Sequence, residues 1–343
     1  MKTEAETEKQ GSKKWLKRAL LGIAAFLGAL LLVIMIYTFV LVNKATEVFP
    51  GNPVDILTSK ELTKDENNRM NFLIFGTSED DEGHSGALLA DSILVVSVGE
   101  KDAKVFSIPR DLWIDYGQVC TIGGTTGKIN AGYVCGLNTN QKDVDKASNY
   151  FTGLVEEVTG LSIPYYVNVS YNTLKELTDM LGGIDVEIYS DDSRGIYDKN
   201  QNLRLPAGVN HLDGETALKL ARARNSKGGY GLSRSNFDRE INQQRIIQAI
   251  FEKAKKTMDP VKAMSTLDIL KKYLKTNVSI SEIRYLADWA DKFTGKIESI
   301  DTSKVLTTGQ IGAASVVIPK AGEGNYTELQ ELIKSEIEGV EEK

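Results

Sequence analysis

Three segments of the chain place arginine side chains where they could bind an anion. Arg110 follows a proline, Arg222 and Arg224 are two residues apart, and Arg239 precedes Gln243 by one helical turn. A guanidinium makes forked, bidentate contacts with phosphate oxygens. On an otherwise acidic chain, the set suggests recognition of a multiply charged anion. Taken singly, each arginine is better explained as a solvated surface residue.

Asp91 is predicted to lie beside Arg110. Residues 92–98 and 104–108 have the pattern of strands, and residues 99–103 have the composition of a hairpin turn. Residues equidistant from such a turn face each other, which puts Asp91 and Arg110 together at the open end. A carboxylate beside a guanidinium suits a binding site. It is equally what a plain surface ion pair looks like.

Arg222 and Arg224 can converge on one site only if the helix before them has ended. Residues two apart do not share a helix face, but they share a face of an extended chain. A helix is predicted over residues 214–221, with Asp213 as its N-cap. A second helix is predicted over residues 239–256, seated by an apolar stripe of Ile246, Ile247, Ile250 and Phe251.

The rest of the chain alternates strand and helix patterns. Strands are predicted over residues 70–75, 164–169, 184–188 and 314–318. Helices are predicted over residues 59–66, 143–159, 171–181 and 327–337, with two more between 259 and 295. The order over residues 164–188 suggests a βαβ unit. The expected fold is therefore α/β, with a mixed central β-sheet flanked by α-helices.

Composition excludes several classes of function. The 343 residues are 41% hydrophobic and 26% charged, which is ordinary for a globular protein. Two cysteines and two histidines are too few for a zinc site built on cysteine, and they disfavour a histidine-based triad. The net charge of −6 argues against nucleic-acid binding.

Residues 19–42 form a run of 24 residues without a charged side chain. As a helix they would reach roughly 36 Å, so we predict one N-terminal transmembrane helix after a basic tail, residues 1–18. A buried core helix or a cleaved signal peptide would usually be shorter. Four basic residues precede the run and only Lys44 closely follows it. This bias predicts a cell-membrane protein with a cytoplasmic N-terminus and an extracellular C-terminal domain.

Cys120 and Cys135 flank a loop rich in glycine and threonine. Outside the cell they can oxidise, so we favour a disulfide that staples this loop. Two buried free thiols remain an alternative. A catalytic cysteine is a third reading, with no histidine near it in sequence.

A series of short motifs follows in order along residues 70–340. They are Asp91-Ser92-Ile93, Ser107-Ile108-Pro109-Arg110-Asp111, Lys128-Ile129-Asn130, Leu181-Gly182-Gly183-Ile184-Asp185-Val186, Leu212-Asp213-Gly214-Glu215, Ala221-Arg222-Ala223-Arg224, and Arg239 with Gln243-Gln244. Together they resemble the LytR-CpsA-Psr family of bacterial cell-wall ligases. The resemblance implies a catalytic domain over residues 70–340, joined to the anchor by an extracellular linker, residues 43–69.

The resemblance also implies a reaction and a site. A glycopolymer would pass from a polyprenyl-pyrophosphate-linked glycan to peptidoglycan through a phosphodiester. Asp91 and Arg110 would be catalytic, and Asp91 would hold Mg²⁺ (or Mn²⁺) or orient the incoming hydroxyl. The pyrophosphate would be bound by Arg110, Arg222, Arg224, Arg239 and Gln243. Displacement at phosphorus depends on charge neutralisation and positioning, which suits such residues.

The chain departs from the family pattern at three places. Ser78 stands where the family usually has an aspartate, so Asp80 is a substitute candidate for the second metal ligand. Leu89-Ala90 and Asn242 stand where an arginine-serine pair and an arginine are common. Two alternatives therefore stay open: a polyprenyl-pyrophosphate hydrolase, and a non-catalytic wall-assembly protein that binds lipid carriers.

Overall fold

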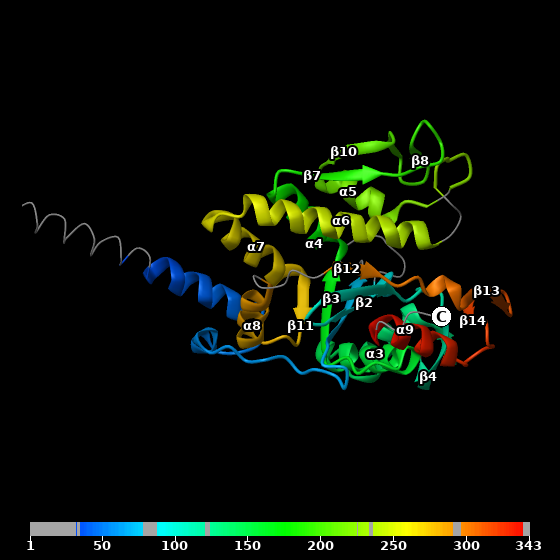
Figure 1. The fold of residues 1–343 in the computed structure, drawn as a ribbon, viewed down its shortest axis with the longest axis horizontal. Coiled ribbons are helices and arrows are strands. Elements are labelled where there is room, and N and C mark those ends of the chain that lie inside the picture. Colours follow the sequence, from blue (N-terminus) through cyan, green and yellow to red (C-terminus); the bar gives the residue numbers. More distant parts are fainter. Residues whose placement is uncertain are drawn as a thin grey trace, which may run out of the picture.

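The computed structural model describes residues 32, 35–77, 88–120, 124–224, 226–232, 236–290 and 296–338. At its centre lies a six-stranded sheet with the strand order β11-β6-β1-β2-β3-β12 (Figure 1). The strands are β1 (Met70–Thr77), β2 (Ser92–Val98), β3 (Asp102–Ser107), β6 (Tyr165–Ser170), β11 (Leu274–Thr276) and β12 (Lys296–Ser299). Because β1 is parallel to β6 but antiparallel to β2, the sheet is mixed, as predicted.

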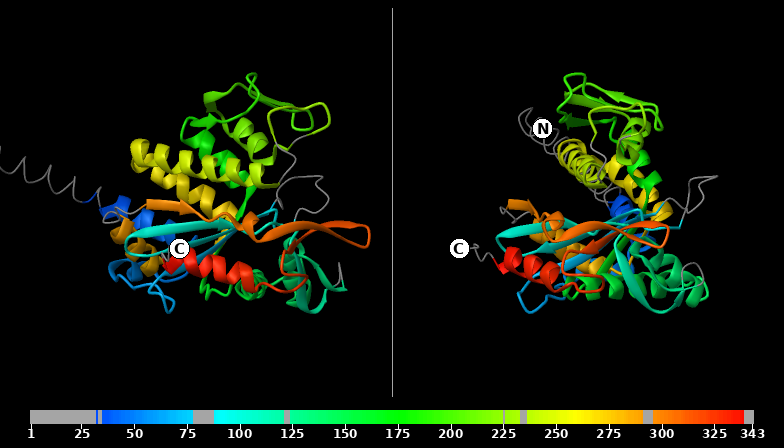
Figure 2. Two further views of the ribbon diagram at one scale, coloured as in Figure 1. Left: turned by 45° about the vertical axis from the view of Figure 1, so that its right-hand side comes forward. Right: turned by 90° about the vertical axis from the view of Figure 1, so that its right-hand side faces the viewer.

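One face of this sheet is covered by α2 (Gly132–Thr139), α3 (Val144–Thr159) and α9 (Thr327–Glu338) (Figure 2). Alternate strand residues such as Leu73 and Phe75 are fully buried in the core beneath these helices. The Phe75 ring packs edge-on against Phe151, with centroids 5.0 Å apart. This core fixes the sheet whose edge carries the candidate site.

A lobe with its own core stands off the opposite face (Figure 2). It contains α4 (Tyr171–Met180), α5 (Gly214–Arg222), α6 (Asn236–Thr257) and two strand pairs, β7 (Ile184–Ile188) with β10 (Gly208–Leu212) and β8 (Ile196–Asp198) with β9 (Leu203–Leu205).

The predicted βαβ unit is wrong, because β7 pairs with β10 and not with the central sheet. Gly182 and Gly183 take positive φ angles of 78° and 89° between α4 and β7, where they turn the chain away. Burial alternates along β7, as in a strand with one solvated face.

Several elements differ from the sequence expectation. The predicted helix over residues 59–66 is absent, and a short 3₁₀ helix, η1 (Pro53–Leu57), lies before it. The Gly/Thr-rich segment forms a hairpin of β4 (Trp113–Cys120) and β5 (Gly124–Lys128) with an irregular register. Another strand that was not predicted, β13 (Leu306–Ile311), pairs with β14 (Ala314–Pro319). The apolar stripe of α6 is only partly seated, since Ile246 is buried whereas Ile247 and Phe251 are exposed.

The end of the predicted transmembrane helix and the segment predicted as a linker both pack on the domain. Residues 35–46 are helical, and the hydroxyl of Tyr37, which lies in the predicted membrane span, donates to the Pro260 carbonyl at the start of α7 (Pro260–Tyr273). Further along, the backbone N–H of Ile280 in α8 (Ile280–Ala290) donates to the Pro50 carbonyl. These contacts tie the N-terminal helix and the segment after it to α7 and α8.

The predicted transmembrane helix falls mostly outside the described residues. Within the part of the chain that the structure describes, no helix is both long enough and apolar enough to cross a bilayer.

Cys120 and Cys135 form a disulfide, with Cα atoms 5.2 Å apart. It joins the end of β4 to α2, and both cysteines are buried in the main core. The bond therefore ties the irregular hairpin to a helix on the covered face of the sheet.

Candidate active site

A pocket of about 300 Å³ opens at the edge of the central sheet. It lies where β1 and β6 end, where β2 begins and where the chain leaves β3. Eight residues line it: Asp91, Arg110, Tyr171, Asp198, Asn200, Gln201, Arg222 and Arg224. Four of the six residues predicted for catalysis or pyrophosphate binding are thus brought together.

The sheet supplies Asp91 and Arg110. The register of β2 and β3 pairs Leu94 with Ser107, and its continuation sets Asp91 opposite Arg110, as predicted. An Nη1 hydrogen of Arg110 is donated to the Asp91 carboxylate. Arg110 Nε is buried without a hydrogen-bond partner among the described residues, so one donor of this guanidinium is unsatisfied.

The segment after β5 holds both of these residues in place. The Asn130 backbone donates to the Arg110 carbonyl (3.2 Å) and accepts from Ala90 N–H (2.9 Å). Lys128 Nζ lies 2.7 Å from a carboxylate oxygen of Asp111, the neighbour of Arg110. The Lys128-Ile129-Asn130 motif therefore has a positioning role, which its place in the motif series could have indicated.

The small lobe supplies Arg222 and Arg224. Helix α5 ends at Arg222, and Ala223 is extended with φ −62° and ψ 139°. This is the helix end that convergence of the two arginines requires, and both line the pocket. The Arg222 guanidinium lies 5.2 Å from the Tyr171 ring centroid, in cation–π contact.

Asp198 is a site residue that sequence reasoning missed. Its carboxylate is almost fully buried and accepts from the backbone N–H groups of Asn200 (2.8 Å) and Arg224 (2.7 Å). It thereby fixes the turn after β8 and the extended residue Arg224 at once. The Asp198-Lys199-Asn200 sequence has the form of an Asx-turn, which was the available signal.

Gln243 lies behind the pocket. Its side-chain nitrogen is 3.0 Å from the Ala221 carbonyl and 3.4 Å from the Tyr171 hydroxyl, and the residue is buried. It therefore braces the last turn of α5 against α4. The backbone of Arg239 belongs to α6, but its side chain and the whole of Asp80 lie outside the described residues.

Among the described residues, the donor set suits a metal ion that shares its ligands with a substrate. No group of three His, Cys, Asp or Glu side chains close enough to hold a metal occurs among the described residues. Two carboxylates, Asp91 and Asp198, line the pocket, and Asp198 is tied to backbone N–H groups. Mg²⁺ is commonly bound by one or two carboxylates together with substrate phosphates. The Asp91 carboxylate therefore suits a Mg²⁺ ion that is held jointly by the protein and by substrate phosphate oxygens.

The charge of the pocket is opposite to that of the chain. Three arginines face two aspartates there, whereas the protein carries a net charge of −6. Arginines from two separate elements can clasp a phosphate group from different sides. The arrangement therefore suits a ligand with more than one anionic oxygen.

A family model matches residues 34–333, and its description is the LytR_cpsA_psr family. The chain is 29% identical over 222 residues to polyisoprenyl-teichoic acid–peptidoglycan teichoic acid transferase TagV of Bacillus subtilis. That alignment covers 63% of this chain and 51% of TagV. A TagU transferase of Bacillus cereus is 24% identical over 277 residues, which is 78% of this chain and 80% of that protein.

Solved structures share the fold. The structure described as TagT bound to LI-WTA aligns with a TM-score of 0.57 and 20% identity, over 82% of this chain and 96% of that one. A second TagT structure, with bound octaprenyl pyrophosphate lipid, aligns over the same shares with a TM-score of 0.53 and 20% identity. Since the family model spans most of the sequence, the chain belongs to the LytR_cpsA_psr family.

Proposed function

We propose that this protein transfers a glycopolymer from a polyprenyl-pyrophosphate carrier to a peptidoglycan hydroxyl, forming a phosphodiester. The observation that carries the proposal is the convergence of Arg110, Arg222 and Arg224 with Asp91 in one pocket. The relatives named as teichoic acid–peptidoglycan transferases support it. So does the TagT structure that holds octaprenyl pyrophosphate.

In this reaction the acceptor oxygen attacks the phosphorus that carries the glycopolymer. The bond from that phosphorus to the bridging oxygen breaks, and polyprenyl phosphate leaves with the electron pair. Arg222 and Arg224 bind the phosphate oxygens and offset the charge of the leaving group. Asp91, oriented by its hydrogen bond from Arg110, positions the acceptor hydroxyl and takes its proton, which passes on to solvent.

A divalent cation belongs to the proposal as a partner of Asp91. Mg²⁺ or Mn²⁺ would be held by the Asp91 carboxylate together with phosphate oxygens, and would supply further neutralisation of phosphate charge. The reaction is placed at the outer face of the cell membrane, with the N-terminus in the cytoplasm, on the charge bias around residues 19–42.

The test uses the full chain in detergent with a labelled lipid-linked glycopolymer and peptidoglycan oligomers. We expect label on peptidoglycan and release of polyprenyl phosphate only when both substrates are present. The double variant Arg222→Ala/Arg224→Ala should lose transfer. Arg284→Ala should not, because this arginine pairs with Asp288 on the exposed face of α8, outside the pocket.

Two outcomes would contradict the transferase. Release of polyprenyl phosphate at the same rate without peptidoglycan would make the protein a hydrolase. Lipid binding that depends on the arginines, with no turnover in the presence of Mg²⁺ or Mn²⁺, would make it a carrier-binding protein.

A further inference from the structure

Two adjoining hollows lie on the small lobe between the end of β7 and α6. Their volumes are about 600 and 350 Å³, and both are lined by Tyr189 and Arg245. We call them together the Tyr189 groove. The larger half extends over residues 188–192 toward Leu232 and Asn242, and the smaller half runs along α6 to Glu252.

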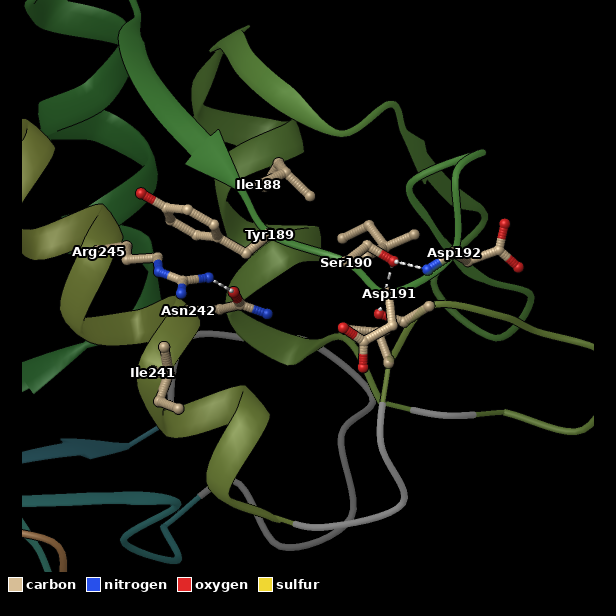
Figure 3. A pocket seen from close by; sticks show the side chains of 11 residues that line it. Ile188, Tyr189, Ser190, Asp191, Asp192, Ile241, Asn242 and Arg245 are labelled. Atoms are coloured by element: carbon tan, nitrogen blue, oxygen red, sulfur yellow. Dashed lines mark hydrogen bonds between the residues drawn. The ribbon is translucent and has the colours of Figure 1, made fainter.

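An exposed aromatic ring stands where the two halves meet. Tyr189 is 61% exposed, although it directly follows a buried strand residue, Ile188. The Arg245 guanidinium lies 4.5 Å from the ring centroid, and its Nη1 is 3.4 Å from the Asn242 side-chain oxygen (Figure 3). The Tyr189 hydroxyl donates to the Glu187 carboxylate. The ring is therefore held in a fixed orientation while much of its surface stays open to a ligand.

Polar groups surround this ring on both sides. In the larger half, Asp191 lies across from Asn242 (Figure 3). In the smaller half, the Gln248 amide donates to Glu252 at 3.0 Å. Carboxylate and amide groups around an open aromatic face offer hydrogen bonds to hydroxyls and an apolar surface to a ring of C–H groups. A pyranose sugar presents both.

Hydrogen bonds join three segments of backbone in the wall of the larger half. Ser190 Oγ donates to the Gly195 carbonyl at 2.9 Å and lies 3.3 Å from the Gly231 carbonyl, which joins three segments. Gly231 has φ 71°, and a Cβ there would lie 2.0 Å from the Gly195 oxygen. No side chain fits at this point, so the backbone itself closes the wall.

The charge of the groove selects against phosphate. Among the side chains that the structure describes, the lining includes five carboxylates and one guanidinium, that of Arg245; the carboxylates belong to Asp185, Glu187, Asp191, Asp192 and Glu252. Two of these carboxylates are paired, Asp192 with Arg194 and Asp185 with His211. The remaining excess is negative, in contrast to the arginine pocket, so a neutral glycan is favoured over an anionic polymer.

The groove and the arginine pocket are neighbours. Ile196 of β8 lines the groove, and Asp198 of the same strand lines the pocket. On α6, Asn242 lines the groove, while Gln243 contacts the end of α5 beside Arg222. A glycan bound in the groove would thus lie next to the arginine pocket, where we place the reacting phosphate.

We propose that the Tyr189 groove binds two consecutive neutral sugars of a glycan chain, with a ring stacked on Tyr189. The role rests on the proposed function, because it positions one of the two glycans that the transfer joins. Both proposed substrates are glycans, and the two arms of the transfer assay below distinguish the acceptor strand from the sugars next to the lipid phosphate.

Binding is tested on the full chain in detergent by calorimetry with chitotetraose, a neutral β-1,4 oligomer of N-acetylglucosamine. We expect saturable binding that Tyr189→Ala weakens about fivefold, the effect of roughly 1 kcal/mol of aromatic contact. Val261→Ala, which truncates an exposed residue on α7 outside the groove, should bind like the unaltered chain. No binding, or equal binding by Tyr189→Ala, would overturn the proposal.

The transfer assay then separates the two sources. A KM for peptidoglycan oligomers that rises in Tyr189→Ala, at an unchanged KM for the lipid, assigns the groove to the acceptor. The reverse assigns it to the donor glycan. If the unaltered chain binds chitotetraose but transfers nothing, the proposed function fails and the groove stands. If transfer proceeds and neither KM moves in Tyr189→Ala, the groove proposal fails alone.

Discussion

Arg110 connects the geometry of the sheet to the charge of the pocket. The hairpin register fixes its position opposite Asp91, and the backbone of Asn130 holds its carbonyl. Its guanidinium reaches the pocket with one N–H group still unsatisfied among the described residues. The Nε atom of Arg110 also lies 3.7 Å from a carboxylate oxygen of Asp111, so Asp91 and Asp111 together orient the guanidinium that lines the pocket.

We expect Arg110→Ala to lower kcat/KM for transfer about 100-fold, the usual effect of removing one preorganised donor to a developing negative charge. Arg110→Lys should not restore the rate, because an ammonium lacks the planar fork. Steady-state kinetics on both variants check this, with Arg284→Ala as the matched arginine control. Rates close to those of the unaltered chain would remove Arg110 from the machinery.

The residues that could be predicted from sequence are those whose placement is local. Asp91 and Arg110 follow from one hairpin, and Arg222 and Arg224 follow from one helix end. Asp198 could not be found in this way, because it reaches the pocket through a strand of a separate lobe. Gln243 was predicted to bind the anion, but its side-chain amide donates a hydrogen bond to the Ala221 carbonyl near the end of α5.

At the scale of elements, Glu282 of α8 holds the segment before β1 on the domain through an ion pair with Lys60. The buried carboxylate accepts from the Tyr165 hydroxyl (3.0 Å) and the Ser279 backbone (2.8 Å), and it pairs with Lys60 (3.0 Å). Burial favours a raised pKa for Glu282. The hydrogen bonds from Ser279, Lys60 and Tyr165 outweigh burial, so its pKa is lowered from the ordinary 4.5.

Because the folded protein binds this proton less readily than the unfolded chain, Glu282 stabilises the fold above pH 4.5 and loses its contribution as the pH falls below that value. We expect Glu282→Gln to lower the free energy of unfolding by about 1–3 kcal/mol at neutral pH. The difference should shrink toward pH 3. Denaturant titrations of both proteins across this pH range measure the difference. A difference that does not change with pH would contradict a stabilising role of the ionised Glu282 carboxylate.

The disulfide stabilises a hairpin that the sequence did not predict. The β4–β5 pair has a shifted register and many glycines, so periodicity gave no strand signal there. For a cross-link spanning 15 residues, we expect Cys120→Ala/Cys135→Ala to reduce the free energy of unfolding by about 3 kcal/mol. Reductant should destabilise the unaltered chain and leave the double variant unchanged. An unaltered chain insensitive to reductant under unfolding conditions would contradict this.

Four strands of the central sheet, β1, β2, β3 and β6, were predictable because they are short apolar runs bounded by turn residues. The edge strands β11 and β12 were not predicted, because their three and four residues are too short and too polar to give a strand pattern. The small lobe was not predictable either. Strand β7 follows a helix in the usual order for a parallel pair, yet two glycines redirect it to pair with β10. Ile247 and Phe251 belong to the predicted stripe but stay exposed, since α6 meets the lobe core through Ile246, Ala249 and Ile250.

At the scale of the whole molecule, the uneven charge predicts the topology. Residues 1–18 carry a net charge of +3, residues 19–42 carry no charged side chain, and the remainder carries −9. We expect the chain to fractionate with membranes and its C-terminal domain to be cleaved by protease added to intact protoplasts. Replacing Lys13, Lys14, Lys17 and Arg18 by glutamate should weaken this orientation. Protection of the domain in intact protoplasts would contradict it.

The pocket draws its charged groups from two hydrophobic cores. Asp91 and Arg110 flank strands whose residues Ile93 and Ile108 belong to the main core, whereas Arg222 and Arg224 flank Ala223 of the lobe core. On the proposed function, a diphosphate bound between them would link the two cores, because its binding energy would be gained only when both are folded and aligned. Occupancy of the pocket by such a ligand would raise the cooperativity of unfolding, so that the main core and the lobe core would unfold together.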